Sequence, residues 1–549
     1  MKKLEVTLLT LAVCILVGCS NKSNQTAQNS VTGGGGGGSS SATTAQSGLN
    51  FTGYPMNATN QTITWFASNG YLPNTAYGSA RESPFHTGLQ EMLGVNIDWQ
   101  FPVTGTDTNQ AFNLVMANEK LPDIVFHGLM KDAQRYMDEG TIYDLTSYIQ
   151  QWAPNYYKWL QTNPEYDRTF KTDEGKYYGF GFFREAGGWN DSYLGPVVRQ
   201  DWLDECGLPI PETIADWDRT LRAFKDRYGA VLSFARTRVA DYGSGIAGAF
   251  GAYTMLTFRL YVDDNHKIQS ATSQPQWRDY LVKLNEWWRD GLLDQDFMTN
   301  DDTMTRTNAL NGKMGISITS MGQLSNWVMD AENSRNGAQW IGLQYPHGVD
   351  GTLSMIPGGY GIGTNAAVIT TSCPQEKLEL VMRALDYAYS DEGNLYWNFG
   401  KQGVSWEYDA NGQPAYLPLV TNDPDGLNNA IDKFGGSTWS GNCIQATLLL
   451  YLKNTQQAID ANDLWFYPNE AVSAKWTVPP GVTLTPDESS RAAELQNTIS
   501  TYSNEMAIKF ITGQEPFSNF NSFVARVNQM GLPELLNINQ TAYDRYLAR

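Results

Sequence analysis

The sequence predicts an α/β body of about 500 residues that follows an export leader and a flexible tether. An amphipathic helix over residues 108–118 is followed by a short apolar strand over 123–126. A strand is also predicted over 61–67, and short apolar or aromatic stretches recur between the later helices. Helices that alternate with short buried strands are typical of α/β folds. A body of this length is too large for one ordinary core, so two or three domains are expected.

The first 18 residues predict a lipoprotein signal peptide. Lys2 and Lys3 precede an apolar run over residues 6–17 that is too short to span a bilayer. The run ends in Leu-Val-Gly-Cys19, which resembles the bacterial lipobox, whose cysteine is lipidated on its thiol and begins the mature chain. The alternative is a plain signal peptide with an incidental cysteine. The lipobox predicts a protein that acyl chains such as palmitate hold at Cys19 on the outer face of the cell membrane.

Residues 19–48 form the predicted tether. They consist largely of Ser, Asn, Gln and Thr and include six consecutive glycines over 33–38. Such a segment buries no apolar surface and behaves as a flexible coil. About 30 residues of this kind have an r.m.s. reach of about 30 Å. The globular body is therefore predicted to span residues 49–549.

The charge of the chain excludes some classes of partner. The formal net charge is −19, and because residues 1–18 contribute +1, the remainder carries −20. A strongly acidic body repels nucleic acid and anionic lipid, so neither is a predicted partner, and the lipid anchor is the one predicted link to the membrane.

Cysteine and histidine usage predicts neither a disulfide framework nor a metal site. Beyond Cys14 and Cys19 there are three widely spaced cysteines, Cys206, Cys373 and Cys443. The four histidines are scattered, without a pair at ligand spacing. No metal and no cofactor are predicted.

Aromatic residues make up 12% of the chain, with 17 Trp and 29 Tyr. Many of them must lie in the core. Large rings with a polar group also suit a wet binding site for a ligand whose surface alternates between apolar and polar. Sugars have such surfaces, so a carbohydrate is a candidate ligand.

Four further helices are predicted from apolar spacing and end signals. The clearest spans residues 213–228, where Thr213 and Asp216 have capping-box spacing and Gly229 follows the last turn. Others are predicted over 276–290 and 491–511. A last long helix starts at Ser518 and is expected to end at Gly531 and Pro533.

Taken in order, several stretches resemble the sugar-type (family 1) extracellular solute-binding lipoproteins of ABC transporters. The resemblance runs from about residue 60 to residue 546, and each motif is weak alone. The motifs are Leu-Pro-Asp123-Ile124, Arg199-Gln-Asp-Trp-Leu203 with Gly207-Leu208 and Pro211-Glu-Thr213, Phe250-Gly-Ala252, Gly291-Leu-Leu-Asp294, Phe510-Ile-Thr-Gly513 and Ala542-Tyr-Asp-Arg-Tyr546.

The resemblance implies a type 2 periplasmic-binding-protein fold, with two α/β lobes, a hinge and a ligand in the cleft between the lobes. Lobe 1 is expected over about residues 60–175 and 360–410, and lobe 2 over about 176–355 and much of 411–549. The glycine-rich stretch over 358–363 is the predicted hinge, because glycines absorb changes in φ and ψ.

Two candidate ligand contacts follow predicted strands of the first lobe. Ligands of open α/β sheets gather beyond the carboxyl ends of the strands, where Asn69 and His127 stand. The alternative for Asn69 is turn formation. Arg184 could anchor a hydroxyl together with Glu185, although a solvated ion pair is the alternative for this pair.

The remaining candidates are aromatic side chains, for which core packing is the alternative. Trp189 is flanked by Gly187, Gly188 and Asn190, an unusual place for a core tryptophan, and is predicted to stack on the ligand. Trp327 and Trp397 fall at plausible helical positions. Tyr360 lies in a glycine-rich stretch without the strand and helix of a dinucleotide site. Trp406 and Trp439 are flanked by glycines and are plausible platforms.

The predicted function is the capture of an extracellular carbohydrate, in particular an oligosaccharide, by a lipid-anchored, monomeric receptor that passes it to a permease. An enzyme is not predicted, because no motif proposes the two carboxylates that a glycosidase holds about 5–10 Å apart. A secreted glycosidase and a sensory sugar-binding module are the alternatives.

Overall fold

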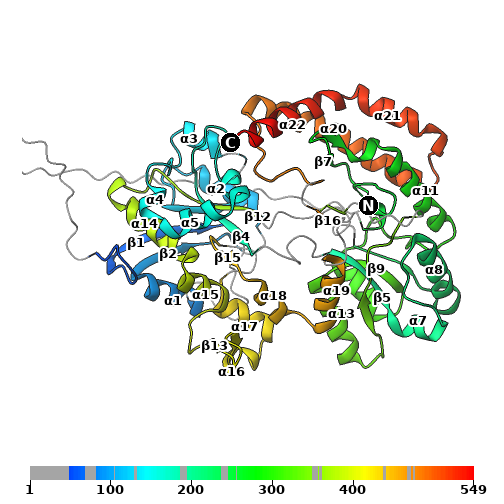
Figure 1. Ribbon diagram of the computed structural model, residues 1–549, viewed down its shortest axis with the longest axis horizontal. Helices are drawn as coiled ribbons and strands as arrows, with labels where there is room; N and C mark the ends of the chain where they lie inside the picture. The colour runs from blue at the N-terminus through cyan, green and yellow to red at the C-terminus, as the bar shows by residue number, and fades with distance from the viewer. Residues whose placement is uncertain are drawn as a thin grey trace, which may run out of the picture. The chain divides into compact units, whose positions relative to one another are not determined.

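The computed structural model describes residues 49–68, 82–103, 106–128, 131, 133–185, 194–235, 245–254, 256–348, 356–357, 362–436, 441–466, 472–473 and 476–549. The chain divides into two units, residues 1–47 and 48–549. The second unit alternates helices and strands, which confirms the predicted α/β class (Figure 1).

A six-stranded sheet forms the centre of the first lobe. Five of its strands run parallel, and β12 is antiparallel to both of its neighbours. The strands, in the order in which they lie side by side, are β15 (Ile444–Gln445), β4 (Phe180–Arg184), β12 (Ile362–Ile369), β3 (Ile124–His127), β1 (Ala58–Ala67) and β2 (Val95–Gln100).

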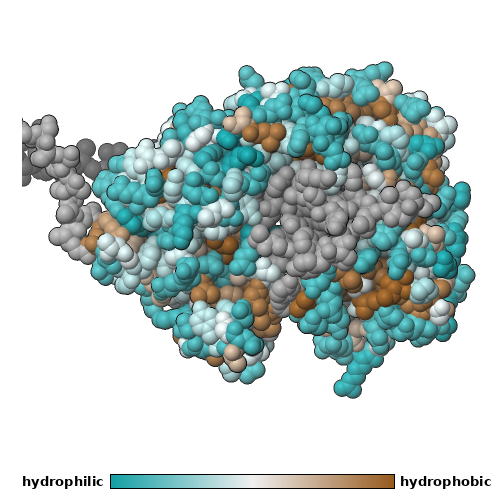
Figure 2. All heavy atoms as spheres, viewed as in Figure 1, coloured by the Kyte–Doolittle hydropathy of each residue, from teal (hydrophilic) through white to brown (hydrophobic). Residues whose placement is uncertain are grey.

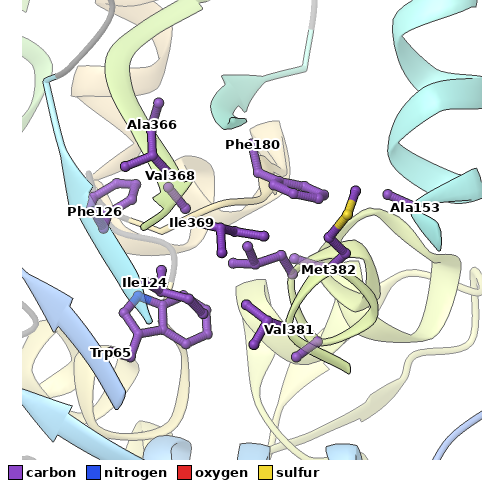
Figure 3. Packing of buried hydrophobic residues seen from close by; sticks show 14 of the residues in the cluster. Trp65, Ile124, Phe126, Ala153, Phe180, Ala366, Val368, Ile369, Val381 and Met382 are labelled. Atoms are coloured by element: carbon purple, nitrogen blue, oxygen red, sulfur yellow. The ribbon is translucent and has the colours of Figure 1, made fainter. Parts of the chain in front are cut away.

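Helices on both sides of this sheet share one hydrophobic core with it. Figure 3 shows part of this core, in which Val381 and Met382 lie close to Ile369 and Phe180 of the sheet. The helices that contribute to it are α1 (Pro84–Leu93), α2 (Thr108–Met116), α3 (Ala133–Asp138), α4 (Ile149–Trp152), α5 (Pro154–Thr162), α6 (Pro164–Thr169), α14 (Leu378–Asp386) and α15 (Asp391–Phe399).

The Leu-Pro-Asp-Ile motif fixes the start of β3. The carboxylate of Asp123 accepts hydrogen bonds from the backbone N–H and the hydroxyl of Thr64 in β1, at 2.7 and 2.8 Å. The same oxygen forms an ion pair with Lys377 at 2.7 Å. Asp123 is 5% exposed, so the pair lies largely out of water. The motif therefore joins two strands and the start of α14.

A four-stranded sheet forms the centre of the second lobe. Its order is β10 (Trp340–Gly342), β5 (Leu194–Arg199), β9 (Met314–Ser320) and β6 (Val231–Leu232). Every residue of β5 and β9 is buried, as expected for strands covered on both faces. The helices of this lobe are α7 (Gln200–Cys206), α8 (Ile214–Tyr228), α10 (Gly245–Gly248), α11 (Pro275–Arg289), α12 (Asp302–Leu310), α13 (Met321–Ser334) and α19 (Gln456–Phe466).

The predicted capping box of α8 is present. Thr213 accepts a hydrogen bond from the backbone N–H of Asp216, whose side chain accepts one from the backbone of Thr213. Gly229 ends the helix at φ 68°, in the left-handed region that favours glycine. Trp217 and Phe224 of the apolar face are fully buried in the core of the second lobe.

Three helices close the chain, one more than the sequence predicts. α20 (Pro486–Ile511) and α21 (Phe520–Gln529) correspond to the predicted helices, and α22 (Leu532–Leu547) follows. The expectation that Gly531 and Pro533 mark only an end is wrong, because Pro533 lies in the first turn of α22. Proline is tolerated there, since the N–H groups of the first turn have no partner within the helix.

The chain changes lobes at places that differ from the expected boundaries. β4 lies in the six-stranded sheet and β5 in the four-stranded one, so the first crossing falls after Arg184 and not near residue 176. The chain returns to the first sheet between β10 and β12. β15 also belongs to the first sheet, whereas α19 packs against β5 and β10. Of the predicted hinge, residues 358–361 lie outside the described part of the chain.

A small cluster extends from the first lobe after α15. It contains Phe399, Trp406 and Val420, and α17 packs against α1. The described residues 411–436 and 441–449 therefore lie with the first lobe, in contrast to the expectation. The elements of this small cluster are β13 (Trp406–Tyr408), β14 (Pro414–Tyr416), α16 (Pro418–Thr421), α17 (Leu427–Phe434) and α18 (Thr447–Lys453). Short strand pairs elsewhere are β7 (Leu260–Val262) with β8 (Ile268–Ser270), and β11 (Ile356–Pro357) with β16 (Val472–Ser473).

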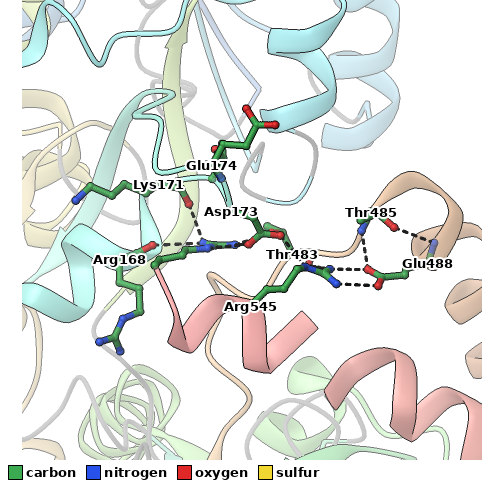
Figure 4. A network of polar contacts seen from close by, with 10 residues as sticks. Arg168, Lys171, Asp173, Glu174, Thr483, Thr485, Glu488 and Arg545 are labelled. Carbon is green, nitrogen blue, oxygen red and sulfur yellow. Dashed lines mark hydrogen bonds and ion pairs between the residues drawn. The ribbon is translucent and has the colours of Figure 1, made fainter. Parts of the chain in front are cut away.

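The end of α22 is tied to the first lobe by a network of ion pairs (Figure 4). Asp173, in the turn before β4, forms ion pairs with Arg545 at 3.0 Å and Arg549 at 2.6 Å. Arg545 also forms an ion pair with Glu488 of α20 at 2.6 Å. Single exposed ion pairs contribute little, but a network that includes the buried Arg549 holds these segments in one arrangement.

On the face shown in Figure 2, most of the surface of the described residues is hydrophilic, and hydrophobic residues appear in patches. None of the helices in the described part of the chain is both long and apolar enough to cross a membrane.

Candidate functional site

The five parallel strands of the first sheet end at the same edge, and polar side chains stand there. In open α/β sheets this carboxyl edge is where ligands bind. Ser68 follows β1 and His127 ends β3, while Arg184 ends β4 and Gln445 ends β15. The fold thus brings together residues that are more than 370 positions apart in the sequence.

The edge is stepped and holds two polar pairs at different levels. His127 and Gly181 both pair with Ala366, so β4 runs three residues further than β3 before it ends. At about 3.3 Å per residue, the step is about 10 Å. Ser68 and His127 form the lower pair, and Arg184 and Gln445, which pair across β4 and β15, form the upper one. A ligand that touches both pairs must be elongated.

His127 is held firmly at the lower level. Its Nδ1 lies 2.5 Å from the hydroxyl of Ser68, and its ring stacks on Phe112 with centroids 4.1 Å apart. The side chain is 7% exposed. The backbone N–H of Ser68 donates to the carbonyl of Phe126 at 3.1 Å, which continues the ladder between β1 and β3. The imidazole is therefore oriented by the fold before any ligand arrives.

At the upper level, the side chain of Glu185 is engaged by the start of α18. Its carboxylate accepts a hydrogen bond from the backbone N–H of Thr447 at 2.7 Å, at the first residue of α18. A carboxylate at that position satisfies an N–H that has no partner within the helix. Its neighbour Arg184 is half-buried and was also predicted as a hydroxyl anchor. Of the predicted pair, Arg184 remains the candidate contact.

Gln445 is the functional candidate that the sequence analysis missed. Its side chain is 1% exposed, and neither the Nε2 nor the Oε1 atom has a hydrogen-bond partner among the described residues. Leaving a buried polar group without a partner costs about 1–3 kcal/mol. An amide with both ends unsatisfied at the carboxyl edge of a sheet is suited to a ligand that both donates and accepts hydrogen bonds.

The backbone around Gln445 is fixed from two sides. The N–H of Glu185 donates to the carbonyl of Gln445 at 3.0 Å. On the other side, α15 supplies Asn398, whose amide oxygen accepts from the N–H of Ala446 at 2.8 Å and whose amide nitrogen donates to the carbonyl of Ile444 at 2.9 Å. The unsatisfied amide therefore stands on a rigid segment.

No signal in the sequence points to Gln445. The strand that carries it has two residues, too few for the alternation that reveals a strand. Its role depends on β4 and α15, which are about 260 and 50 residues away in the chain.

Three predicted aromatic contacts lie in hydrophobic clusters, each 2% exposed. Trp397 packs on Phe85, with centroids 5.0 Å apart, in the core of the first lobe. Trp406 donates from its indole nitrogen to the carbonyl of Gly400 at 2.9 Å. Trp327 packs on Trp340 at 5.2 Å. This burial is what the packing alternative requires of all three.

The other predicted residues cannot be placed. Asn69, Trp189, Tyr360 and Trp439 lie outside the described residues, as does the predicted lipidation site Cys19. Their roles stay predictions.

Residues 73–395 of the chain match the family described as bacterial extracellular solute-binding protein. A relative in Streptococcus pneumoniae serotype 4 is named fructooligosaccharide ABC transporter substrate-binding protein FusA. It is 21% identical over 480 residues, which cover 84% of this chain and 86% of the relative.

Solved structures share the fold across nearly the whole chain. The alginate-binding protein AlgQ2 superposes with a TM-score of 0.69 at 20% identity and covers 88% of this chain and 99% of its own. An HMO-binding, ABC-transporter-associated solute-binding protein from Bifidobacterium longum infantis has a TM-score of 0.71 at 15% identity, over 88% of this chain and 99% of its own. These likenesses confirm the predicted two-lobe solute-binding fold.

The AlgQ2 structure is described as being without calcium ion, which raises the question of a metal in this chain. In the part of the chain that the structure describes, no three His, Cys, Asp or Glu side chains gather as metal ligands.

Proposed function

Because the chain belongs to the bacterial extracellular solute-binding protein family, we propose that it captures an extracellular oligosaccharide for import by an ABC transporter. The observation that carries this proposal is the buried, unpartnered amide of Gln445 beside Arg184 at the carboxyl edge of the first sheet. Sugar hydroxyls both donate and accept hydrogen bonds, so they can satisfy both ends of this amide.

The step in the sheet edge supports an oligosaccharide and not a single sugar. The pairs Ser68–His127 and Arg184–Gln445 lie on levels about 10 Å apart, a separation that suits several linked sugar units better than one. The relatives support the same class, since one is named for fructooligosaccharide and another for alginate. The ligand is therefore a chain of sugar units, whose identity, linkage and charge a binding screen must determine.

Capture without chemistry is the proposed mode of action. A glycosidase needs two carboxylates flanking the bond to be broken. Among the described residues that directly follow the five parallel strands, Glu185 is the one carboxylate, and it is engaged at the start of α18. The proposal therefore assigns binding to this edge and no catalytic residue.

The second lobe is proposed to supply the other half of the site. A ligand closes two lobes only if it binds the closed state better, which requires contacts to both. Asn69 and His127 are the proposed contacts of the first lobe, together with Arg184 and Gln445. Trp189 remains the proposed stacking residue. The aromatic residues Tyr360 and Trp439 keep a secondary place in the proposal, whereas the burial of Trp327, Trp397 and Trp406 favours structural roles.

A screen of purified protein against neutral and acidic oligosaccharides tests the function. Ligand at a hundred times Kd should stabilise the body by about 2.7 kcal/mol, which is visible as a rise in melting temperature. The mixture is then analysed by chromatography after long incubation. Stoichiometric binding without products supports the receptor, whereas cleaved oligosaccharide contradicts it in favour of a glycosidase.

The receptor is further proposed to be a monomer that is anchored outside the cell through Cys19. Changing Cys19 to Ala should release the protein from the membrane fraction or stall its processing, because the lipobox cysteine is the acylated residue. Fractionation followed by immunoblotting measures this, with Cys206→Ala as the control that should stay in the membrane fraction. A processed and membrane-bound Cys19→Ala protein would contradict the anchor.

A further inference from the structure

A cavity of about 660 Å³ lies between α3, the turn before β4 and the start of α20. Its lining includes Tyr178, Thr172 and Asp173 from the turn region, and Thr485 and Ser489 from α20. β4 begins near this turn and ends at Arg184, so these residues lie at the opposite edge of the sheet from Gln445. The cavity is therefore separate from the candidate site. Its size falls in the range of about 300–1,000 Å³ that is typical of small-molecule sites.

The charged groups of the cavity balance in number and are mostly paired with protein groups. Lys131, Arg135 and Lys171 face Asp138, Glu139 and Asp173. Arg135 forms an ion pair with Glu139 at 3.2 Å, and Lys171 forms one with Asp167 at 2.5 Å.

Asp173 is held by two arginines of α22 (Figure 4). A charged ligand would have to compete with these internal partners. A neutral ligand can use the hydrogen-bonding capacity that remains on the paired groups, since each carboxylate has about four acceptor sites and guanidinium has five donors.

The floor of the cavity offers an aromatic ring and an unsatisfied hydroxyl. Tyr178 is 1% exposed, and its hydroxyl has no hydrogen-bond partner among the described residues. Leu484 and Pro486 add apolar surface. A sugar ring has C–H groups on its faces and hydroxyls around its edge. It can therefore pack on the apolar side chains and donate or accept hydrogen bonds at the paired charges that border them. A hydroxyl that reaches the floor would also give Tyr178 the partner it lacks.

We propose that this cavity is a second binding site, separate from the sheet edge, for a neutral polyhydroxyl compound of monosaccharide to disaccharide size. The site joins the first lobe to α20, whose Leu495 and Ile499 lie in the core of the second lobe. Its occupant therefore contacts segments of both lobes.

Two neighbouring serines provide a matched pair of blocking variants. Ser489 and Ser490 are both exposed residues in the second turn of α20, but only Ser489 lines the cavity. Ser489→Trp should fill the cavity and weaken binding of glycerol, glucose and sucrose at least tenfold, measured by saturation-transfer NMR and calorimetry. Ser490→Trp should bind them like the wild type. If none of the three probes binds the wild type, or if both variants bind equally well, the proposal is wrong.

The charge preference is tested with three sugars that share one ring. Glucose should bind at least tenfold more tightly than anionic glucuronate and cationic glucosamine, because the charges of the cavity are balanced. Tighter binding of either charged sugar would overturn the neutral class. Tyr178→Phe should weaken glucose binding, whereas Tyr280→Phe, which removes another buried and unpartnered hydroxyl outside the cavity, should not.

A variant at the sheet edge separates this proposal from the proposed function. Gln445→Leu should weaken oligosaccharide binding at the edge at least tenfold and leave glucose binding in the cavity unchanged. Ser489→Trp should weaken glucose binding and leave oligosaccharide binding unchanged. If the wild type binds the oligosaccharide at the edge but none of the small sugars in the cavity, only the second site is contradicted, and the proposed function stands. Crystals of Gln445→Leu soaked in sucrose should show it beside Tyr178, and a cavity that holds only water would contradict the proposal.

Discussion

Two buried polar side chains of the first lobe, Asp386 in the core and Gln445 at the carboxyl edge of the sheet, differ in how their hydrogen-bonding groups are satisfied. In the core, Asp386 is 2% exposed, and its carboxylate accepts hydrogen bonds from the backbone N–H of Tyr156 at 2.8 Å and the side chain of Asn155 at 2.7 Å. At the edge, Gln445 is 1% exposed, and neither end of its amide has a hydrogen-bond partner among the described residues. Single polar atoms without a partner also occur in the core, such as the hydroxyl of Tyr387, but among the described residues Gln445 is the buried side chain with two of them. Because buried polar groups are normally hydrogen-bonded, an amide with both ends unsatisfied fits the ligand contact proposed for Gln445.

Helix α15 contributes to both the core and the sheet edge within one turn. Trp397 points into the core, where it packs on Phe85 and Trp65. The adjacent Asn398 points to β15 and fixes the backbone on both sides of Gln445. Because the same helix supports the core and positions the edge, variants on its two faces separate stability from binding.

The largest expected effect is on stability, from Trp397→Ala. Removing a fully packed tryptophan from a core costs about 3–5 kcal/mol, so the free energy of unfolding in urea should fall by that amount. Tyr408→Ala is the control, because Tyr408 is 50% exposed and should cost little. A Trp397→Ala protein of unchanged stability that binds oligosaccharide poorly would instead make Trp397 a ligand platform, as first predicted.

A second effect depends on pH, through Asp386. Burial raises the pKa of this carboxyl from 3.8 to about 6. The folded state therefore binds more protons than the unfolded state between these values, and this group lowers stability as pH rises from about 4 to 6. Asp386→Asn removes the titration. Relative to the wild type, the variant should gain about 3 kcal/mol between pH 4 and 7, since two pKa units correspond to about 2.7 kcal/mol.

His86 and Asp330 affect stability in the opposite direction to Asp386, since both contribute stability that is lost as the pH falls. Burial lowers the pKa of His86 to about 3, so its contribution to stability is lost as pH falls below 6.5, and it titrates in both proteins. Asp330→Asn is the control, because the ion pair with Arg306 lowers the pKa of Asp330. This control should lose stability at neutral pH and match the wild type in acid. A pH-independent difference for Asp386→Asn would contradict the burial of its charge.

The parts of the fold that the sequence predicts are those encoded by neighbouring residues. The helix that starts at Thr213 and the strand that contains Ile124 follow from capping and apolar spacing, and both are confirmed. The lobe of β4 was predicted wrongly, because its partner β12 begins about 180 residues later.

The same distinction applies to the candidate site. His127 could be predicted as a candidate because it stands at the end of an apolar strand. The tryptophans were chosen by residue type, and residue type does not distinguish a packed ring from an exposed one. Gln445 could not be predicted from the sequence. What marks it is a buried amide without a hydrogen-bond partner among the described residues, and that depends on every segment packed around it.

The smallest expected effect is that of Gln445→Leu, which tests the difference between Gln445 and the buried polar groups of the core directly. Leucine is close to glutamine in shape, and it replaces two unsatisfied polar atoms with apolar ones. The free protein should therefore be as stable as the wild type or more stable, because the cost of the unsatisfied amide disappears.

Ser503→Ala is the matched control, since it removes another buried and unpartnered polar atom in α20, within the second lobe. Both variants should keep or raise the melting temperature of the free protein. Only Gln445→Leu should weaken oligosaccharide binding at least tenfold, about 1.4 kcal/mol. If Gln445→Leu destabilises the free protein instead, its amide has a structural partner, and the distinction between the edge and the core fails.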